Sequence, residues 1–183
     1  MLIGLTGTPG TGKTSVSKFL EKYRHVKVIH LNDVIKENHL YTEIDEKRDS
    51  VIADMELIRE YIEKTVEEEE KEITILESHL SHYIADIAIV LRLYPPELEM
   101  RLKKRGYSEE KIKENFEAEA LDVILVEASE WCKKVFEVDT TGKSIEEVGK
   151  DIEKILDHVL SGNEEELPEY EPGSIDWIDL VPD

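Results

Sequence analysis

Short apolar runs alternate with amphipathic segments along almost the whole chain. The apolar runs predict strands at residues 2–5, 26–31, 73–76, 87–91 and 135–138, because short, continuous apolar runs are typical of strands that are buried on both faces. Apolar residues three or four positions apart fill the intervening segments and predict helices with one buried face. These helices start near residues 13, 32, 53, 95, 108 and 145; the third runs to about residue 70 and the fifth to about residue 131.

The order of these elements predicts the fold class. Strands that alternate with helices favour an α/β fold in three layers, with a five-stranded parallel sheet between two layers of helices. A sheet of this kind binds its ligand at the carboxyl ends of its strands. The polar segment at residues 41–50 predicts a loop.

The chain after residue 160 differs from the rest in composition. Residues 161–183 hold eight acidic residues and neither Lys nor Arg, so this acidic tail cannot form a core of its own. Its end is nevertheless apolar, with Ile175, Trp177, Ile178 and Leu180. Two interpretations remain open: the tail docks on the domain formed by residues 1–160, or it presents an apolar strip to a partner.

Charge narrows the classes of partner. Among 183 residues, 43 are acidic and 23 are basic, which gives a formal net charge of −20. A free-standing nucleic-acid binder needs basic side chains for phosphate contacts, so we expect no direct nucleic-acid patch. The charge fits a basic protein partner, or simply solubility in a Glu/Lys/Ile-rich composition of the thermophile kind.

Two further features point to a cytoplasmic protein. The single cysteine, Cys132, excludes an internal disulfide and fits a reducing compartment, where it is expected as a small core residue. No apolar run approaches the length of a membrane span, so no membrane association is expected.

The first strand leads into a motif that binds phosphate. Residues 7–14 read Gly-Thr-Pro-Gly-Thr-Gly-Lys-Thr and match G-x-x-x-x-G-K-[ST], the P-loop. Glycines let successive N–H groups turn toward an anion, and the N-terminus of the following helix favours negative charge. Lys13 is placed to reach the phosphates and the Thr14 hydroxyl to bind Mg²⁺.

The end of the third strand supplies candidates for catalysis. A P-loop enzyme needs a second carboxylate to orient Mg²⁺, and Glu77 follows the strand directly. His79 is placed to position water or to hold an acceptor phosphate. Two other interpretations stay open for the histidines: an ordinary hydrogen-bonded His79, or a metal pair with His82.

Two arginines share one face of the helix after the fourth strand. Arg101 and Arg105 are four residues apart. Guanidinium groups in this place stack on a base and grip phosphates. Salt bridges to Glu97 or Glu109 on a surface helix are the other interpretation.

These motifs together resemble one family. The P-loop, the helix start at residues 32–36, the Glu77-x-His79 motif, the run at residues 101–107 and the run at residues 111–119 resemble the adenylate kinase isoenzyme six family in the same order. The resemblance covers residues 1–160 and leaves out the acidic tail.

The resemblance implies a P-loop kinase domain at residues 1–160, with an NMP-binding helical insert at 33–70 and a short lid at 106–116. It implies transfer of the ATP γ-phosphoryl to AMP or dAMP with Mg²⁺, and ATP hydrolysis. It also implies a role in maturing the rRNA of the small ribosomal subunit with a basic ribosomal protein of the uS11 type. A third function, phosphorylation of a small metabolite as in shikimate-type kinases, explains the P-loop but not the run from Arg101 to Glu119.

The resemblance assigns roles by position. Lys13, Glu77, His79 and Arg105 are expected to be catalytic, and Thr14 and Glu77 to hold the metal. Asp33, Lys36 and His79 are expected at the nucleoside monophosphate. Nucleotide binding is expected at Gly10, Thr11, Gly12, Lys13, Thr14, Ser15, Arg101, Thr141, Gly142 and Lys143.

Three departures from the family pattern affect these roles. Glu77 stands where the family has Asp, and its extra methylene alters the metal shell. Lys36 replaces the arginine common in the NMP helix and lacks its bidentate fork. Residues 104–121 hold only Arg105 and lysines, and fewer arginines should weaken phosphoryl transfer. A rival interpretation follows: the chain is an assembly chaperone switched by ATP hydrolysis, with AMP phosphorylation incidental.

Overall fold

The computed structural model describes residues 1–45, 50–68, 71–162 and 166–181. A central sheet holds five parallel strands in the order β2-β5-β1-β6-β7. The strands are β1 (Leu2–Thr6), β2 (Val26–His30), β5 (Ile73–Glu77), β6 (Ile87–Arg92) and β7 (Lys134–Asp139). All five predicted strands are confirmed to within two residues at each end.

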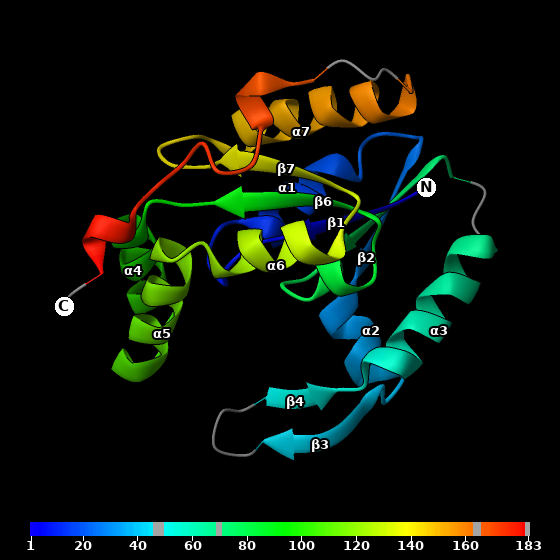
Figure 1. Cartoon of the computed structure of the whole chain (residues 1–183). Helices are drawn as coiled ribbons and strands as arrows, with labels where there is room; N and C mark the ends of the chain where they lie inside the picture. The colour runs from blue at the N-terminus through cyan, green and yellow to red at the C-terminus, as the bar shows by residue number, and fades with distance from the viewer. Residues whose placement is uncertain (46–49, 69–70, 163–165, 182–183) are drawn as a thin grey trace.

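Helices cover both faces of this sheet, so the predicted three-layer α/β class is confirmed (Figure 1). The α-helices are α1 (Lys13–Leu20), α2 (Leu31–Glu37), α3 (Met55–Glu67), α4 (Pro95–Lys104), α5 (Glu109–Ala120), α6 (Val123–Trp131) and α7 (Ile145–Leu160). Three short 3₁₀ helices are η1 (Ser81–Tyr83), η2 (Pro168–Tyr170) and η3 (Ile178–Leu180). The described residues contain no helix with both the length and the apolarity to span a membrane.

Alternate residues of each strand pack into different cores, as the pleat of a strand requires. In β6, Ile89 and Leu91 join the core beneath α1 and α7, whereas Ala88 and Val90 face α6. A third core lies between β5, α2 and α3 around Ile58. Burial on both faces explains why each strand reads as a continuous apolar run.

The prediction of a loop at residues 41–50 is wrong. Residues Tyr41–Asp45 form β3 and Ser50–Ala53 form β4, and the two strands pair as an antiparallel hairpin. Figure 1 shows this hairpin below α2 and α3, away from the main sheet. The insert after β2 is therefore not helical throughout. The expected end of α3 at residue 70 lies outside the described residues.

The prediction of one helix over residues 108–131 is also wrong. Asp122 adopts a left-handed conformation with φ 56°, which ends α5 and starts α6 in a new direction. Aspartate tolerates this conformation better than most residues. Ser108 caps α5 as predicted, since its side chain accepts a hydrogen bond from the N–H of Lys111.

The described part of the acidic tail docks on the domain. Tyr170 is buried in the core beneath α7, and its hydroxyl donates to Asp151 Oδ1 at 2.9 Å. The N–H groups of Gly173 and Ser174 donate to Glu137 Oε2 at 2.9 and 3.0 Å. The docked interpretation of the tail is therefore confirmed for these residues.

Candidate functional site

The phosphate-binding loop joins β1 to α1 at the carboxyl edge of the sheet. Gly7, Gly10 and Gly12 have φ of 135°, 104° and 106°, which side chains other than glycine rarely adopt. A Cβ on Gly7 would also lie 2.4 Å from the carbonyl oxygen of Leu91. No side chain caps the N-terminus of α1. Its first backbone N–H groups are therefore available to bind an anion.

The Lys13 side chain lies inside this loop. Its ammonium donates to the carbonyl oxygens of Gly7 at 2.7 Å and Thr8 at 3.1 Å. Burial lowers the pKa of Lys13 to about 8, against the opposing influence of the Glu77 and Glu119 carboxylates. Lys13 therefore carries positive charge at neutral pH in a place where a polyphosphate would replace the carbonyl contacts.

Oxygen ligands suited to Mg²⁺ lie beside the loop. The Thr14 hydroxyl donates to Glu77 Oε1 at 3.3 Å, and Glu77 is only 7% exposed. Hydroxyl and carboxylate oxygens are the ligands that Mg²⁺ prefers, usually together with substrate phosphates. The residues present therefore fit this metal.

Sequence reasoning missed His30, which holds the other oxygen of Glu77. His30 Nδ1 lies 2.9 Å from Glu77 Oε2, and the two residues are register partners on β2 and β5. A polar residue at the end of the neighbouring strand was the available signal. This contact with His30 fixes the direction of the Glu77 carboxylate.

The two histidines near η1 have different surroundings. His79 is half-buried, and burial together with Lys13 lowers its pKa to about 4, so its imidazole is neutral at pH 7. His82 is 1% exposed, and its Nδ1 lies 3.1 Å from the Thr6 hydroxyl. Among the described residues, no group of three or more His, Cys, Asp or Glu side chains could hold a metal ion. Nothing in this geometry favours the metal-pair interpretation.

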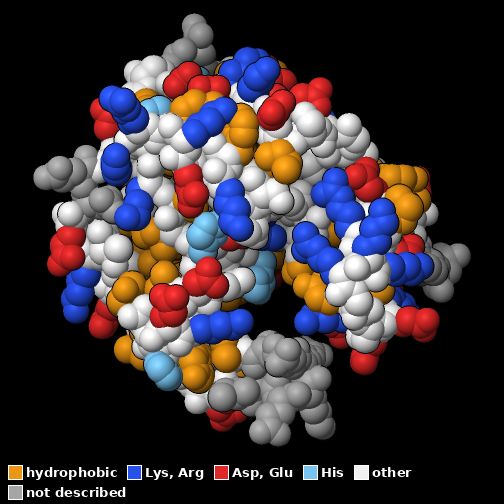
Figure 2. Space-filling view, turned by 180° about the vertical axis from the view of Figure 1, so that it is seen from behind, with side chains coloured by type: hydrophobic (Ala, Val, Ile, Leu, Met, Phe, Trp, Pro, Cys, Tyr) orange, Lys and Arg blue, Asp and Glu red, His pale blue; other side chains and the backbone are white. Residues whose placement is uncertain are grey.

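A cavity of about 570 Å³ opens over the phosphate-binding loop and is called the loop cavity below. Figure 2 shows the hollow between the arm that carries α4 and α5 and the rest of the molecule, with blue Lys and Arg and pale blue His side chains at its rim. Its lining includes the predicted residues Gly10, Gly12, Lys13, Thr14, Ser15, Glu77, His79 and Arg105. It also includes Asn32, Tyr107, Lys111 and Asn115, to which the sequence analysis gave no role.

The predicted Arg101 touches the loop but is not among the residues that line the loop cavity. Its guanidinium forms a salt bridge with Glu97 at 2.7 Å and donates to the Gly10 carbonyl at 3.3 Å. The N–H of Gly142 donates to the same Glu97 carboxylate at 3.4 Å. The salt-bridge interpretation of Arg101 is thus confirmed, and this side chain also touches the loop.

The other predicted residues do not line the loop cavity. Thr141 accepts a hydrogen bond from the N–H of Tyr94, and Lys143 pairs with Asp151 at 2.8 Å. Thr11 is buried and its hydroxyl donates to the Thr8 carbonyl. Asp33 and Lys36, which were expected at the acceptor together with His79, are both exposed. Lys36 lines a second cavity.

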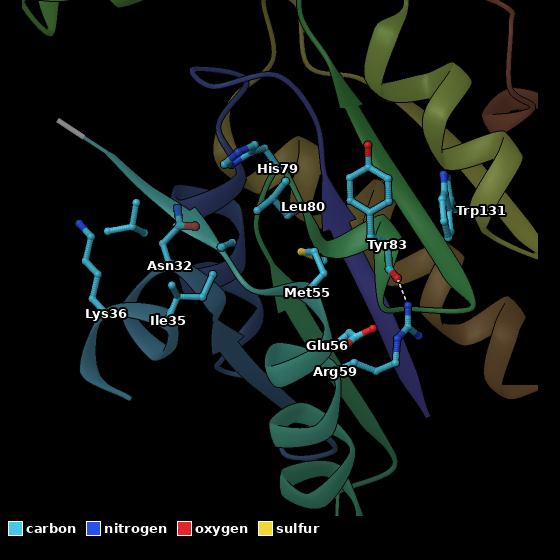
Figure 3. Close-up of a pocket in the computed structure, with 12 residues that line it drawn as sticks. Asn32, Ile35, Lys36, Met55, Glu56, Arg59, His79, Leu80, Tyr83 and Trp131 are labelled. Atoms are coloured by element: carbon cyan, nitrogen blue, oxygen red, sulfur yellow. Dashed lines mark hydrogen bonds between the residues drawn. The ribbon is translucent and has the colours of Figure 1, made fainter. Parts of the chain in front are cut away.

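This second cavity, of about 780 Å³, lies between α2, α3 and η1 and is called the insert cavity below (Figure 3). Asn32 and His79 line both cavities, so the two share a wall. The Ser78 hydroxyl donates to Asn32 Oδ1 at 3.3 Å and helps to hold this wall. Two adjoining cavities that meet beside Lys13 and Glu77 can hold two ligands with their reacting ends together.

A buried ion cluster lies beneath the loop cavity. Arg92, 1% exposed, pairs with Glu119, Asp122 and Glu137. Burial opposes its charge, but these carboxylates outweigh burial and raise the pKa of Arg92. Glu119 was predicted only as part of a motif and without a role, because charged residues from separate elements give no periodic signal.

Residues 3–122 match the AAA domain family. The chain is 78% identical over 182 residues to a Methanosarcina barkeri protein named "Putative adenylate kinase", and 68% identical over 186 residues to a Methanosarcina acetivorans protein of the same name. Both matches cover 100% of each chain. Shikimate kinase from Bacteroides thetaiotaomicron is similar in structure, with a TM-score of 0.54 at 20% identity over 86% of this chain and 98% of that one. This likeness shows the P-loop kinase fold alone.

Proposed function

The chain belongs to an archaeal family of P-loop proteins whose members are named "Putative adenylate kinase", and from that premise we propose that it transfers the γ-phosphoryl group of ATP to AMP or dAMP. The products are ADP and the nucleoside diphosphate of the acceptor. One observation carries the proposal: the loop cavity and the insert cavity share Asn32 and His79 as a wall. A donor and an acceptor nucleotide in these cavities meet with their phosphates at that wall.

The loop residues bind the donor. Backbone N–H groups of the loop and of the first turn of α1 hold the phosphates, and Lys13 exchanges its two carbonyl contacts for phosphate oxygens. Thr14 and Glu77 are the residues that would hold Mg²⁺. The metal, when bound, neutralises phosphate charge that develops during transfer.

The acceptor occupies the insert cavity with its phosphate toward His79. Lys36 and Asn32 line this cavity, and the neutral His79 is able to accept a hydrogen bond from a protonated phosphate or to donate one to a phosphate oxygen. We assign residues 33–70 to the acceptor insert and residues 106–116 to a lid over the loop cavity. Arg105 lines the loop cavity and contacts the phosphoryl group in transfer.

The test is ADP formation from MgATP with and without AMP. We expect AMP to increase ADP formation strongly, and Lys13→Ala to abolish it. If ADP forms at the same rate without AMP, the chain is an ATPase and the kinase proposal fails. His79→Ala separates the two reactions, because loss of hydrolysis with retained transfer to AMP assigns this side chain to the attacking water.

The net charge of −20 favours a second candidate function. An acidic surface shields a basic ribosomal protein, such as one of the uS11 type, until it reaches small-subunit rRNA, with ATP hydrolysis as the switch. A pull-down with the purified ribosomal protein tests this function. Retention that changes between ATP and ADP supports it, and retention that is equal in every nucleotide state rejects it.

A further inference from the structure

The insert cavity has two chemically different ends. Lys36, Asn32 and His79 supply charge and hydrogen-bonding groups on one side, whereas Tyr83 and Trp131 supply aromatic rings on the other, where Glu56 and Arg59 also line the cavity. Figure 3 shows the two rings next to each other, with Met55 between them and Asn32. A ligand that fits both ends is anionic at one end and carries a flat apolar group at the other.

Contacts on several sides hold Tyr83, the inner ring of the aromatic end, in place. The centroid of the Tyr83 ring lies 4.1 Å from that of the His82 ring and 5.4 Å from that of the Trp131 ring. The Tyr83 and Trp131 rings meet edge to face, with 79° between their planes. The Tyr83 carbonyl accepts a hydrogen bond from Arg59 Nη2 at 2.5 Å (Figure 3). Rings fixed before binding lose little conformational entropy when a ligand stacks on them.

Trp131 is unusually exposed for a tryptophan. It is 60% exposed at the end of α6, although a ring of this size gains much free energy when it is covered. Because the ring also lines a cavity, a ligand in that cavity can cover it. Its position beside the half-buried Tyr83 makes an aromatic surface rather than a single exposed side chain.

We propose that Tyr83 and Trp131 form the base-binding end of the insert cavity and stack on the heterocyclic base of the acceptor nucleotide. The inference rests on the proposed function, which places the acceptor phosphate at the His79 end. Stacking on aromatic side chains tolerates any base, because every base has a π-face. Purines present a larger face than pyrimidines, so this end favours AMP over CMP.

The two tryptophans of the chain, Trp131 and Trp177, allow a direct binding test. Trp177→Phe leaves Trp131 as the only tryptophan emitter, and Trp131→Phe leaves Trp177. We expect AMP without ATP to change the emission of the Trp177→Phe protein and not that of the Trp131→Phe protein. Ribose 5-phosphate, which has no base, should change neither. Unchanged Trp131 emission while calorimetry records AMP binding would overturn the inference.

Substitution tests the same point by affinity. We expect Trp131→Ala to weaken AMP binding about tenfold and to narrow the preference for AMP over CMP, because one of the two stacking rings is lost. Trp131→Phe should retain most of the affinity. Val126→Ala, at an exposed apolar position of the same helix, is the matched control and should bind AMP normally.

Two outcomes separate this inference from the proposed function. AMP binding that depends on Trp131, in a protein that transfers no phosphoryl group, would support the base site and reject the kinase. Normal AMP binding by Trp131→Ala, with a fall in sedimenting mass relative to the unaltered protein, would reject the base site and assign Trp131 to contact with a second copy.

Discussion

The Thr8 hydroxyl in the phosphate-binding loop donates a hydrogen bond to Oε2 of Glu119, a buried carboxylate near the end of α5. Glu119 Oε1 also accepts bonds from Arg92 Nε and the N–H of Leu93, both at 2.9 Å. One carboxylate therefore ties the loop to the end of β6 and to the helix that lines the loop cavity.

We expect Glu119→Gln to lower the free energy of unfolding by about 3 kcal/mol, because it removes a charged partner from buried Arg92. Thr8→Val removes only the hydrogen bond between the loop and Glu119 and should lower the free energy of unfolding by about 1 kcal/mol. Urea unfolding of both variants measures the difference. Equal small losses would mean that Glu119 does not hold the cluster together.

Lys111 is expected to contribute to phosphoryl transfer. Lys111 lines the loop cavity. Its ammonium lies 4.9 Å from the centroid of the Tyr107 ring, and this contact restricts the conformations of the Lys111 side chain. Lys111→Met should lower kcat for AMP phosphorylation about tenfold through loss of charge beside the phosphates, and Lys111→Arg should restore part of it.

Lys113 is the matched control on the same helix. It is 74% exposed and pairs with Glu117 at 3.6 Å. Lys113→Met should leave kcat unchanged. If both methionine variants lose the same activity, the effect comes from the net charge of α5 and not from contact with phosphate.

His82 should make the protein less stable in acid. Burial lowers the pKa of His82 from 6.5 to about 4, so the unfolded chain takes up a proton between these pH values and the folded protein does not. Its contribution to stability is complete above pH 6.5 and is lost as the pH falls toward 4. The slope attributable to His82 is at most about 1.4 kcal/mol per pH unit.

The comparison is between the unaltered protein and His82→Gln. The variant should show a shallower fall in the free energy of unfolding between pH 6.5 and 4, measured by urea unfolding at each pH. Glu127 Oε2 lies 3.4 Å from His82 Nε2 and Thr6 faces Nδ1. Parallel curves for the two proteins would show that Glu127 keeps the imidazole protonated in the fold.

The docked tail should stabilise the domain. Truncation after residue 166 removes buried Tyr170 and the two N–H donors to Glu137 Oε2. We expect a loss of about 3 kcal/mol, since an apolar ring is exposed and a buried carboxylate loses partners. Truncation after Leu180 keeps these contacts and should change stability little. Thermal unfolding compares the two, and equal melting temperatures would contradict a stabilising role.

The local pattern predicted the sheet and the phosphate-binding loop well for a physical reason. Strands buried on both faces read as apolar runs, and the loop needs glycines such as Gly7 and Gly10 at fixed spacing. These signals lie within a few residues of one another. Lys13 and Thr14 lie in the loop, and Glu77 and His79 follow a strand directly, so these local signals were enough to predict them beside the loop cavity. Arg105 was predicted instead from its spacing with Arg101 and from the family resemblance.

The missed features depend on contacts between distant segments. The strands β3 and β4 are only five and four residues long, and their pairing becomes visible only when the two strands meet. The break at Asp122 lacks Gly or Pro, and its side chain bonds to Arg92, 30 residues earlier. His30 and Lys111 reach the site because separate elements pack beside each other, and no single stretch of sequence shows that packing.

The common wall of Asn32 and His79 has a consequence for redesign. A change at either position alters both proposed nucleotide sites at once, so under the proposed function acceptor choice and donor affinity cannot be tuned separately there. Of the two cavities, Met55 and Trp131 border the insert cavity and not the loop cavity. A different acceptor is therefore best sought at these outer positions, where the machinery around Lys13 stays untouched.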